Sequence, residues 1–175
     1  MSIYTNDLRE AIIRPTLEAL GEWSQNAENL LLGTAAQESQ LGFRLHSESD
    51  NGLGLYRISA RTHTQIWDKF LINDPNLAST LRGLASQQQF LKNPHHELIV
   101  NLSYATGVAW MIYKHHELIL PYNPSVYELA QSWASYYCAR DDQNDQLTHK
   151  NIAEIDTFVQ NYHALVLSEN KILAA

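Results

Sequence analysis

Capping side chains stand directly before proline at Asp74-Pro75, Asn93-Pro94 and Asn123-Pro124. An Asp or Asn side chain accepts a hydrogen bond from the first backbone N–H groups of a helix. Proline is tolerated in the first turn because its missing N–H would have no partner there. The first two pairs therefore each predict a helix start, and a further helix is expected to start at Asn123-Pro124 or at Ser125. We expect a mainly α-helical chain.

The spacing of the apolar residues predicts where the helices run. The expected helices are 5–20, 26–41, 59–71, 75–90, 94–116, 125–137 and 148–168, with Ser59, Ser125 and Thr148 as N-caps, a kink or split at Pro15 and a stop at Gly21. The apolar middle of 94–116 predicts a central buried helix. In the last helix the residues expected to face inward are Ile152, Ile155, Phe158, Val159, Tyr162 and Val166.

Two segments break the helical pattern. Residues 42–58 contain three glycines and a polar run, and are expected to form a loop with a small irregular hairpin. Residues 139–147 are charged and polar, and are expected to form a second loop. The length of 175 residues fits one domain, 1–175, large enough to bury a core without disulfides.

The charge balance narrows the classes of partner. A net charge of -7 argues against binding of nucleic acid or anionic lipid through a basic surface. Cys138 is the only cysteine, so no intramolecular disulfide is expected. No signal peptide and no run long enough to span a membrane are seen, which predicts synthesis in the cytoplasm without membrane insertion. A target outside the cytoplasm would then need another delivery route.

Glu38 interrupts the apolar face of the helix expected at 26–41. Residues three and four apart share a helix face, and here that face carries Leu31, Thr34, Ala35, Glu38 and Leu41. Burial and the negative end of the helix dipole, just before the expected C′ glycine Gly42, both favour the protonated carboxyl group. A protonated acid suits a glycosidase, which must protonate a leaving oxygen. The same pattern also fits an ordinary glutamate that reaches solvent.

Other chemistries have weaker support in the sequence. The pairs His95-His96 and His115-His116 point different ways on a helix and neither completes His-Glu-x-x-His, so no metal site and no cofactor are expected. Cys138 with His149 or His163 would be the parts of a thiol enzyme, but a small buried residue is the simpler interpretation of Cys138.

Three motifs follow in an order that points to one family. Ala35–Ser39 reads Ala-x-Gln-Glu-Ser, Gly54–Thr62 contains Gly-Leu-Tyr-Arg-Ile, and Tyr136–Arg140 lies at an expected helix end. This order resembles the lytic transglycosylase and goose-type lysozyme branch of the lysozyme-like superfamily, especially the versions encoded by bacteriophages and prophages. The resemblance covers residues 26–72 well and residues 125–162 loosely. It implies a lysozyme-like helical domain.

The resemblance also implies roles for individual residues. Glu38 matches the catalytic acid, Ser39 the serine that orients the substrate or the glutamate, and Tyr137 the tyrosine that hydrogen-bonds the glutamate. Leu55, Tyr56 and Ile58 match the motif that lines the glycan groove. The substrate implied is the glycan strand of peptidoglycan. Glu48 and Asp50 are the candidates for a second carboxylate, if the reaction is hydrolysis with inversion.

Three departures from the family pattern bear on activity. Arg57 replaces a Gln and Cys138 an Asn, both in positions expected to contact substrate, and Arg140 replaces a Gly. A guanidinium beside Glu38 would favour the carboxylate form. Two functions therefore remain open: a cell-wall-degrading glycosidase, virion-associated or released at lysis, and a catalytically inactive structural or glycan-binding relative that contacts virion proteins.

Overall fold

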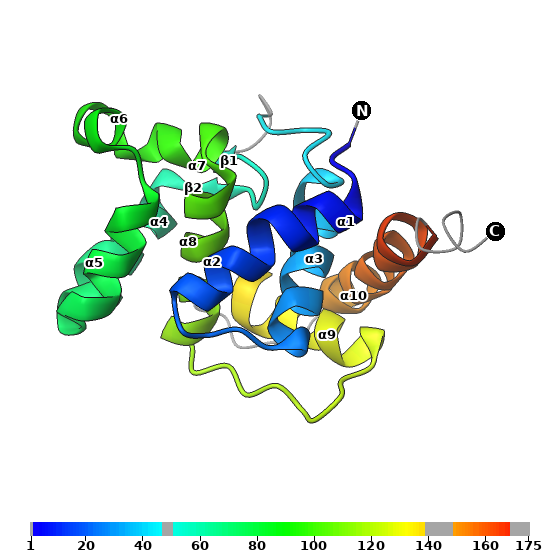
Figure 1. The fold of residues 1–175 in the computed structure, drawn as a ribbon. Helices are drawn as coiled ribbons and strands as arrows, with labels where there is room; N and C mark the ends of the chain where they lie inside the picture. Colours follow the sequence, from blue (N-terminus) through cyan, green and yellow to red (C-terminus); the bar gives the residue numbers. More distant parts are fainter. Residues whose placement is uncertain (1, 47–50, 139–148, 169–175) are drawn as a thin grey trace.

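The computed structural model describes residues 2–46, 51–138 and 149–168, which are mainly helical (Figure 1). The first helical segment consists of α1 (Thr5–Asp7), the π-helical η1 (Leu8–Ile13) and α2 (Arg14–Ala19). Pro15 does not split this segment, because it falls in the first turn of α2, directly after the π-helical stretch. Gly21 ends it as predicted, with φ of 70° and a hydrogen bond from the N–H of Glu22 to the carbonyl of Leu17 at 2.8 Å.

The second helix, α3 (Gln25–Ser39), begins at Ser24, whose side chain accepts a hydrogen bond from the N–H of Ala27. It ends two residues before the predicted boundary. Gln40 and Leu41 already have left-handed backbones, with φ of 53° and 54°, and Gly42 follows with φ of 83°. The expected left-handed glycine is therefore the third residue of a left-handed run.

The predicted hairpin is present as β1 (Gly52–Leu53) and β2 (Ile58–Ser59), which pair antiparallel. Ser59 then caps α4 (Ala60–Gln65), as expected, by accepting a hydrogen bond from the N–H of Thr62. The helix continues as the π-helical η2 (Ile66–Phe70) and the 3₁₀ turn η3 (Leu71–Asn73).

The next two predicted helices are each divided. Asp74 caps α5 (Pro75–Leu84), which ends before α6 (Gln87–Lys92) begins. The predicted helix 94–116 starts as the 3₁₀ turn η4 (Pro94–His96) and α7 (Glu97–Val100), and then restarts as α8 (Leu102–His115). The break is Asn101, whose side chain accepts from the N–H of Tyr104 and donates to the buried carboxylate of Glu97 at 2.9 Å.

The last helices are α9 (Val126–Ser132), the π-helical η5 (Trp133–Cys138), α10 (His149–Asn161) and η6 (Tyr162–Leu167). Ser125 and Glu128 form the predicted capping box of α9. Phe158, Tyr162 and Val166 are buried as expected, but Ile152 is 56% exposed, because it lies near the outer end of α10. The expected loop 139–147, the cap Thr148 and the chain after 168 lie outside the described residues.

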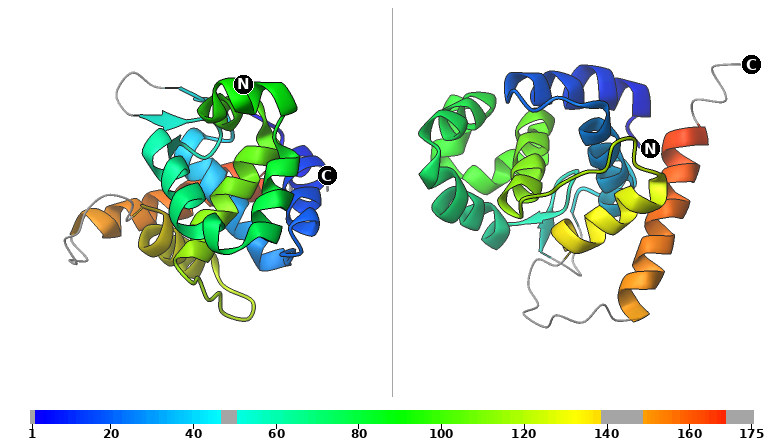
Figure 2. Two further views of the ribbon diagram at one scale, coloured as in Figure 1. Left: turned by 90° about the vertical axis from the view of Figure 1, so that its left-hand side faces the viewer. Right: turned by 90° about the horizontal axis from the view of Figure 1, so that it is seen from below.

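Two helices form the centre of the molecule. Residues 104–113 of α8 are all buried, which confirms the predicted central helix, and most of α3 is buried beside it. Figures 1 and 2 show α4, α5, α6 and α7 gathered on one side of α8, while α9 and α10 lie along α3. Within the described ranges, no helix has both the length and the apolar character to cross a membrane.

Candidate functional site

Glu38 lies in the last turn of α3, half-buried, where it meets η5. The indole Nε1–H of Trp133 donates a hydrogen bond to its Oε1 at 3.0 Å. Trp133 is buried and its ring lies 5.5 Å from that of Phe158 in α10, so packing in the core holds the donor in place. A neighbouring side chain, Gln37, accepts a hydrogen bond from Asn161 at 2.8 Å, which ties the same turn to α10.

The backbone around this turn is strained. Gln40 and Leu41 directly follow the Glu38 turn in left-handed conformations, and Arg57 in the hairpin turn has φ of 52°. Such a conformation costs about 1–3 kcal/mol for a non-glycine residue, and it persists only where the surrounding structure enforces it. These outliers cluster around the end of α3 and the hairpin that contacts it. Clustered strain of this kind is typical of functional sites.

Ser39 joins the two strained segments. Its buried hydroxyl donates a hydrogen bond to the carbonyl oxygen of Leu55 at 2.6 Å and accepts one from the N–H of Gly42 at 2.9 Å. The side chain therefore holds the hairpin against the end of α3. Of the two roles that the family resemblance implies for this serine, the geometry supports positioning the Glu38 turn.

Tyr137 also supports the hairpin. Its buried hydroxyl donates to the carbonyl oxygen of Tyr56 at 2.8 Å, and its ring packs 5.2 Å from that of Tyr113. A phenol has a single proton, and the Tyr137 hydroxyl donates that proton to Tyr56. In the hydrogen bond expected between Tyr137 and Glu38, the carboxyl group would therefore have to be the donor.

The side chains expected to line a glycan groove lie in the core. Leu55, Tyr56 and Ile58 are fully buried, and Tyr56 accepts a hydrogen bond from Thr106 in α8 at 3.2 Å. Burial raises the pKa of the Tyr56 hydroxyl above its ordinary value. The expectation that these three side chains line a groove is therefore corrected: they anchor the hairpin from within, because their apolar surface is worth more in the core than in contact with solvent.

Arg57 turns inward. Only 8% of its surface is exposed, and its Nε lies 3.0 Å from the point that a Cβ atom on Gly52 would occupy. The side chain therefore packs over β1, and Gly52 provides the room for it. A buried guanidinium in the hairpin is a feature that the family pattern, with Gln at this position, does not have.

Four residues of interest lie outside the description. The candidate second carboxylates Glu48 and Asp50, the side chain of Cys138, and Arg140 are not among the described parts of the chain. The hydrolytic and thiol-dependent alternatives that depend on them stay predictions.

A second polar cluster was not expected from the sequence. His63 in α4 is buried, with Nδ1 2.9 Å from Nδ1 of His95 and Nε2 2.6 Å from the hydroxyl of Tyr104. Burial, with a contribution from His95, lowers the pKa of His63 to about 4. Among the residues that the structure places, no three His, Cys, Asp or Glu side chains converge as a metal site.

The long-range contacts explain what the sequence could not reveal. Trp133 stands 95 residues from Glu38, and no local spacing links them. No known protein family, curated protein or solved structure matches the chain.

Proposed function

We propose that this protein is a peptidoglycan-cleaving glycosidase in which Glu38 acts as general acid and base. The observation that carries the proposal is the hydrogen bond from the buried indole of Trp133 to Glu38, at the end of α3 beside a strained hairpin. A half-buried carboxyl group held by a rigid donor in this setting is suited to proton transfer. The order of the three motifs, which resembles the lytic transglycosylases, supports the same function.

The proposed reaction starts from the protonated carboxyl group of Glu38, whose Oε1 accepts the indole N–H of Trp133. Glu38 would protonate the oxygen between N-acetylmuramic acid and N-acetylglucosamine, and become a carboxylate. That carboxylate would then take the proton of the muramic 6-hydroxyl as its oxygen attacks the anomeric carbon, which gives a 1,6-anhydro end. Hydrolysis would instead add water, with Glu48 or Asp50 as the candidate base.

A second function is favoured by a specific observation. The side chains of Leu55, Tyr56 and Ile58 are buried, and Arg57 is packed inward where the family pattern has Gln. Such a hairpin is compatible with a protein that keeps the helical scaffold and binds glycan or virion proteins without catalysis. In either case the resemblance supports an origin in a phage or prophage, and action in a virion or after lysis.

Loss of turbidity of purified cell walls tests the proposal. Wild-type protein is expected to clear the suspension, and Glu38→Gln, which removes the acid but keeps the shape, is expected to lower the rate by at least about a hundredfold. Glu10→Gln, in an exposed ion pair of the first helical segment, is the matched control and should clear normally. Equal clearing by wild type and Glu38→Gln would contradict the role of Glu38.

Mass analysis of the released muropeptides separates the two reactions. A transglycosylase leaves a muramic end lighter by one water than the reducing end left by a hydrolase. If the folded wild type causes no clearing but binds to cell walls, the result supports the non-catalytic function.

A further inference from the structure

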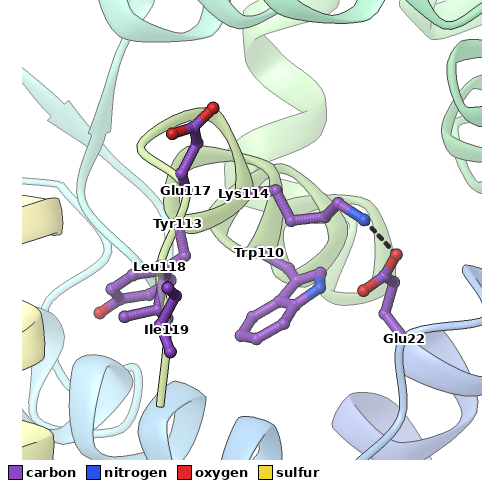
Figure 3. A pocket seen from close by; sticks show the side chains of 7 residues that line it. All are labelled: Glu22, Trp110, Tyr113, Lys114, Glu117, Leu118 and Ile119. Atoms are coloured by element: carbon purple, nitrogen blue, oxygen red, sulfur yellow. Dashed lines mark hydrogen bonds and ion pairs between the residues drawn. The ribbon is translucent and has the colours of Figure 1, made fainter.

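A pocket lies at the opposite end of α3 from Glu38. It has a volume of about 340 Å³ and is lined by the end of α8, the residues after it and Glu22 (Figure 3); the lining residues are Glu22, Trp110, Tyr113, Lys114, Glu117, Leu118 and Ile119. This volume falls at the small end of the range of about 300–1,000 Å³ that is usual for ligand sites. Glu22 precedes α3 and Glu38 ends it, so the two sites are roughly 20 Å apart along the helix.

One wall of the pocket carries an unsatisfied donor. Trp110 is 8% exposed, and within the described part of the chain nothing accepts a hydrogen bond from its buried Nε1–H. In Figure 3 the indole nitrogen lies on the side of the ring that faces Lys114 and Glu22. Leaving such a donor buried costs about 1–3 kcal/mol. An acceptor that reached it would recover that cost.

Charges of both signs surround this donor. Lys114 and Glu22 form an ion pair, and their side chains keep 31% and 28% exposure, so both remain reachable. Glu117 lies on the rim in a left-handed backbone with φ of 54°, and in Figure 3 its carboxylate points away from Trp110 and Glu22. Leu118 and the exposed Ile119 supply an apolar wall. The pocket therefore offers two donors, the Glu22 carboxylate and one apolar side.

We propose that this pocket binds a small zwitterion, an α-amino acid with an apolar side chain. Its carboxylate would pair with the Lys114 ammonium and the Trp110 N–H, and its ammonium would pair with Glu22, so that the ion pair between Lys114 and Glu22 is exchanged for two pairs with the ligand. Its side chain would pack on Leu118 and Ile119. A simple anion leaves the Glu22 carboxylate unpaired, and a simple cation leaves the Trp110 donor unpaired. The inference is independent of the proposed glycosidase activity.

Nuclear magnetic resonance of the four tryptophan indole N–H groups tests this proposal, with Trp110→Phe to assign the relevant signal. Titration with L-leucine is expected to move the Trp110 signal downfield and to leave that of Trp67, which donates to Tyr104 on the far side of α8, unchanged. N-acetyl-L-leucine lacks the ammonium and L-leucinamide lacks the carboxylate, so each is expected to bind at least tenfold more weakly.

Variants separate binding from damage to the fold. Lys114→Met is expected to weaken leucine binding at least tenfold, and Lys69→Met, at an exposed position in η2, should not change it. The dispersion of the remaining signals reports whether each variant is folded. The proposal is overturned if leucine moves no indole signal of the wild type, if either derivative binds as well as leucine, or if N-acetylglucosamine moves the Trp110 signal as strongly.

Discussion

The side chains around Glu38 show how one carboxyl group is kept in a single orientation. A carboxyl group on a helix end has several rotamers, and a catalyst needs one of them. Trp133 favours one of them, because its Nε1 donates a hydrogen bond to Oε1 at 3.0 Å and its ring packs against Phe158. The orienting residue is itself buried in the core.

Trp133→Phe tests this orientation. Phenylalanine keeps an aromatic ring against Phe158 but removes the N–H donor, and a hydrogen bond to Glu38 as it becomes a carboxylate in the proposed reaction is worth about 1.5–3 kcal/mol. We expect the rate of cell-wall clearing to fall by about tenfold or more, with the far-ultraviolet circular dichroism unchanged. An unchanged rate in the folded variant would show that Glu38 is positioned without Trp133.

A second carboxylate, Glu28, has a purely structural setting. It is fully buried and accepts hydrogen bonds from Arg9 at 2.8 Å, Arg14 at 2.6 Å and Trp23 at 2.7 Å. Burial alone would raise its pKa, but these three donors hold the pKa of Glu28 below its ordinary value. Its stabilising effect is therefore complete above the unfolded pKa and is lost as the pH falls through the lower, folded pKa.

Glu28→Gln is expected to lower the free energy of unfolding by about 3 kcal/mol, because two guanidinium groups lose their buried counter-charge. Urea denaturation at neutral pH measures this loss. The control is again Glu10→Gln: its pair with Arg14 is exposed, and such pairs contribute only about 0–1 kcal/mol. Equal urea midpoints of unfolding for Glu28→Gln and Glu10→Gln would contradict the structural role of Glu28.

At the scale of the elements, the sequence predicted helix starts better than helix ends and breaks. Ser59, Asp74 and Ser125 cap helices as expected, because a capping bond involves residues only two or three positions apart. Asn101 was not predicted as a break, because its effect depends on Glu97 and on the carbonyl of Leu84, which it reaches across the fold. The end of α3 was misplaced because tertiary contacts force Gln40 and Leu41 into left-handed conformations.

In the candidate site, too, the sequence predicted local features but not long-range contacts. The position of Glu38 in the last turn of its helix followed from local spacing, and so did the hairpin after it. The inward direction of Leu55, Tyr56 and Arg57 did not follow from local spacing, because all three lie in the turn between β1 and β2, where no strand alternation defines a buried face. Contacts such as Trp133 with Glu38 or Ser39 with Leu55 join segments whose separation only the fold determines.

The hairpin depends on one glycine at its turn. A Cβ atom on Gly54 would lie 1.7 Å from the carbonyl oxygen of Leu98, and the residue has φ of 70°. Gly54→Ala is therefore expected to cost at least about 3 kcal/mol, from the clash and the backbone strain together. Gly83→Ala is the matched control: its Cβ would meet nothing within 4 Å, and alanine should stabilise α5 by up to about 1 kcal/mol. Thermal unfolding of the two variants, with shifts of opposite sign, checks the prediction.

At the scale of the whole molecule, the two sides of α8 are fixed by different chemistry. Facing α3, Tyr113 and Thr34 form one hydroxyl contact of 2.7 Å inside an apolar core. On the other side, His63 of α4 meets His95 of η4 and Tyr104 of α8, and Trp67 donates to the Tyr104 hydroxyl at 2.9 Å. This second contact joins three separate elements through a buried histidine. The half of the molecule built on it should therefore respond to pH.

The direction of that response follows from the pKa of His63, which burial lowers to about 4. In the unfolded chain this histidine has a pKa of about 6.5 and takes up a proton first. The neutral imidazole therefore contributes its full stabilisation to the folded protein above pH ~6.5. The free energy of unfolding then falls as the pH drops from there to about 4, by roughly 3 kcal/mol in total. Glu28 and Glu97, whose pKa values are lowered, add their losses only below about pH 4.5.

Urea midpoints of wild type and His63→Gln between pH 7 and pH 4.5 separate these contributions. We expect the wild type to lose stability steadily across this range, and His63→Gln to start less stable at pH 7 and to lose less stability down to pH 4.5. The loss that remains comes from His116, whose pKa burial also lowers. His163→Gln, at an exposed position of η6, should follow the wild type. Parallel curves for wild type and His63→Gln would mean that the buried imidazole is not what makes this half of the molecule sensitive to acid, and the carboxylate of Glu97 would then be the group to replace.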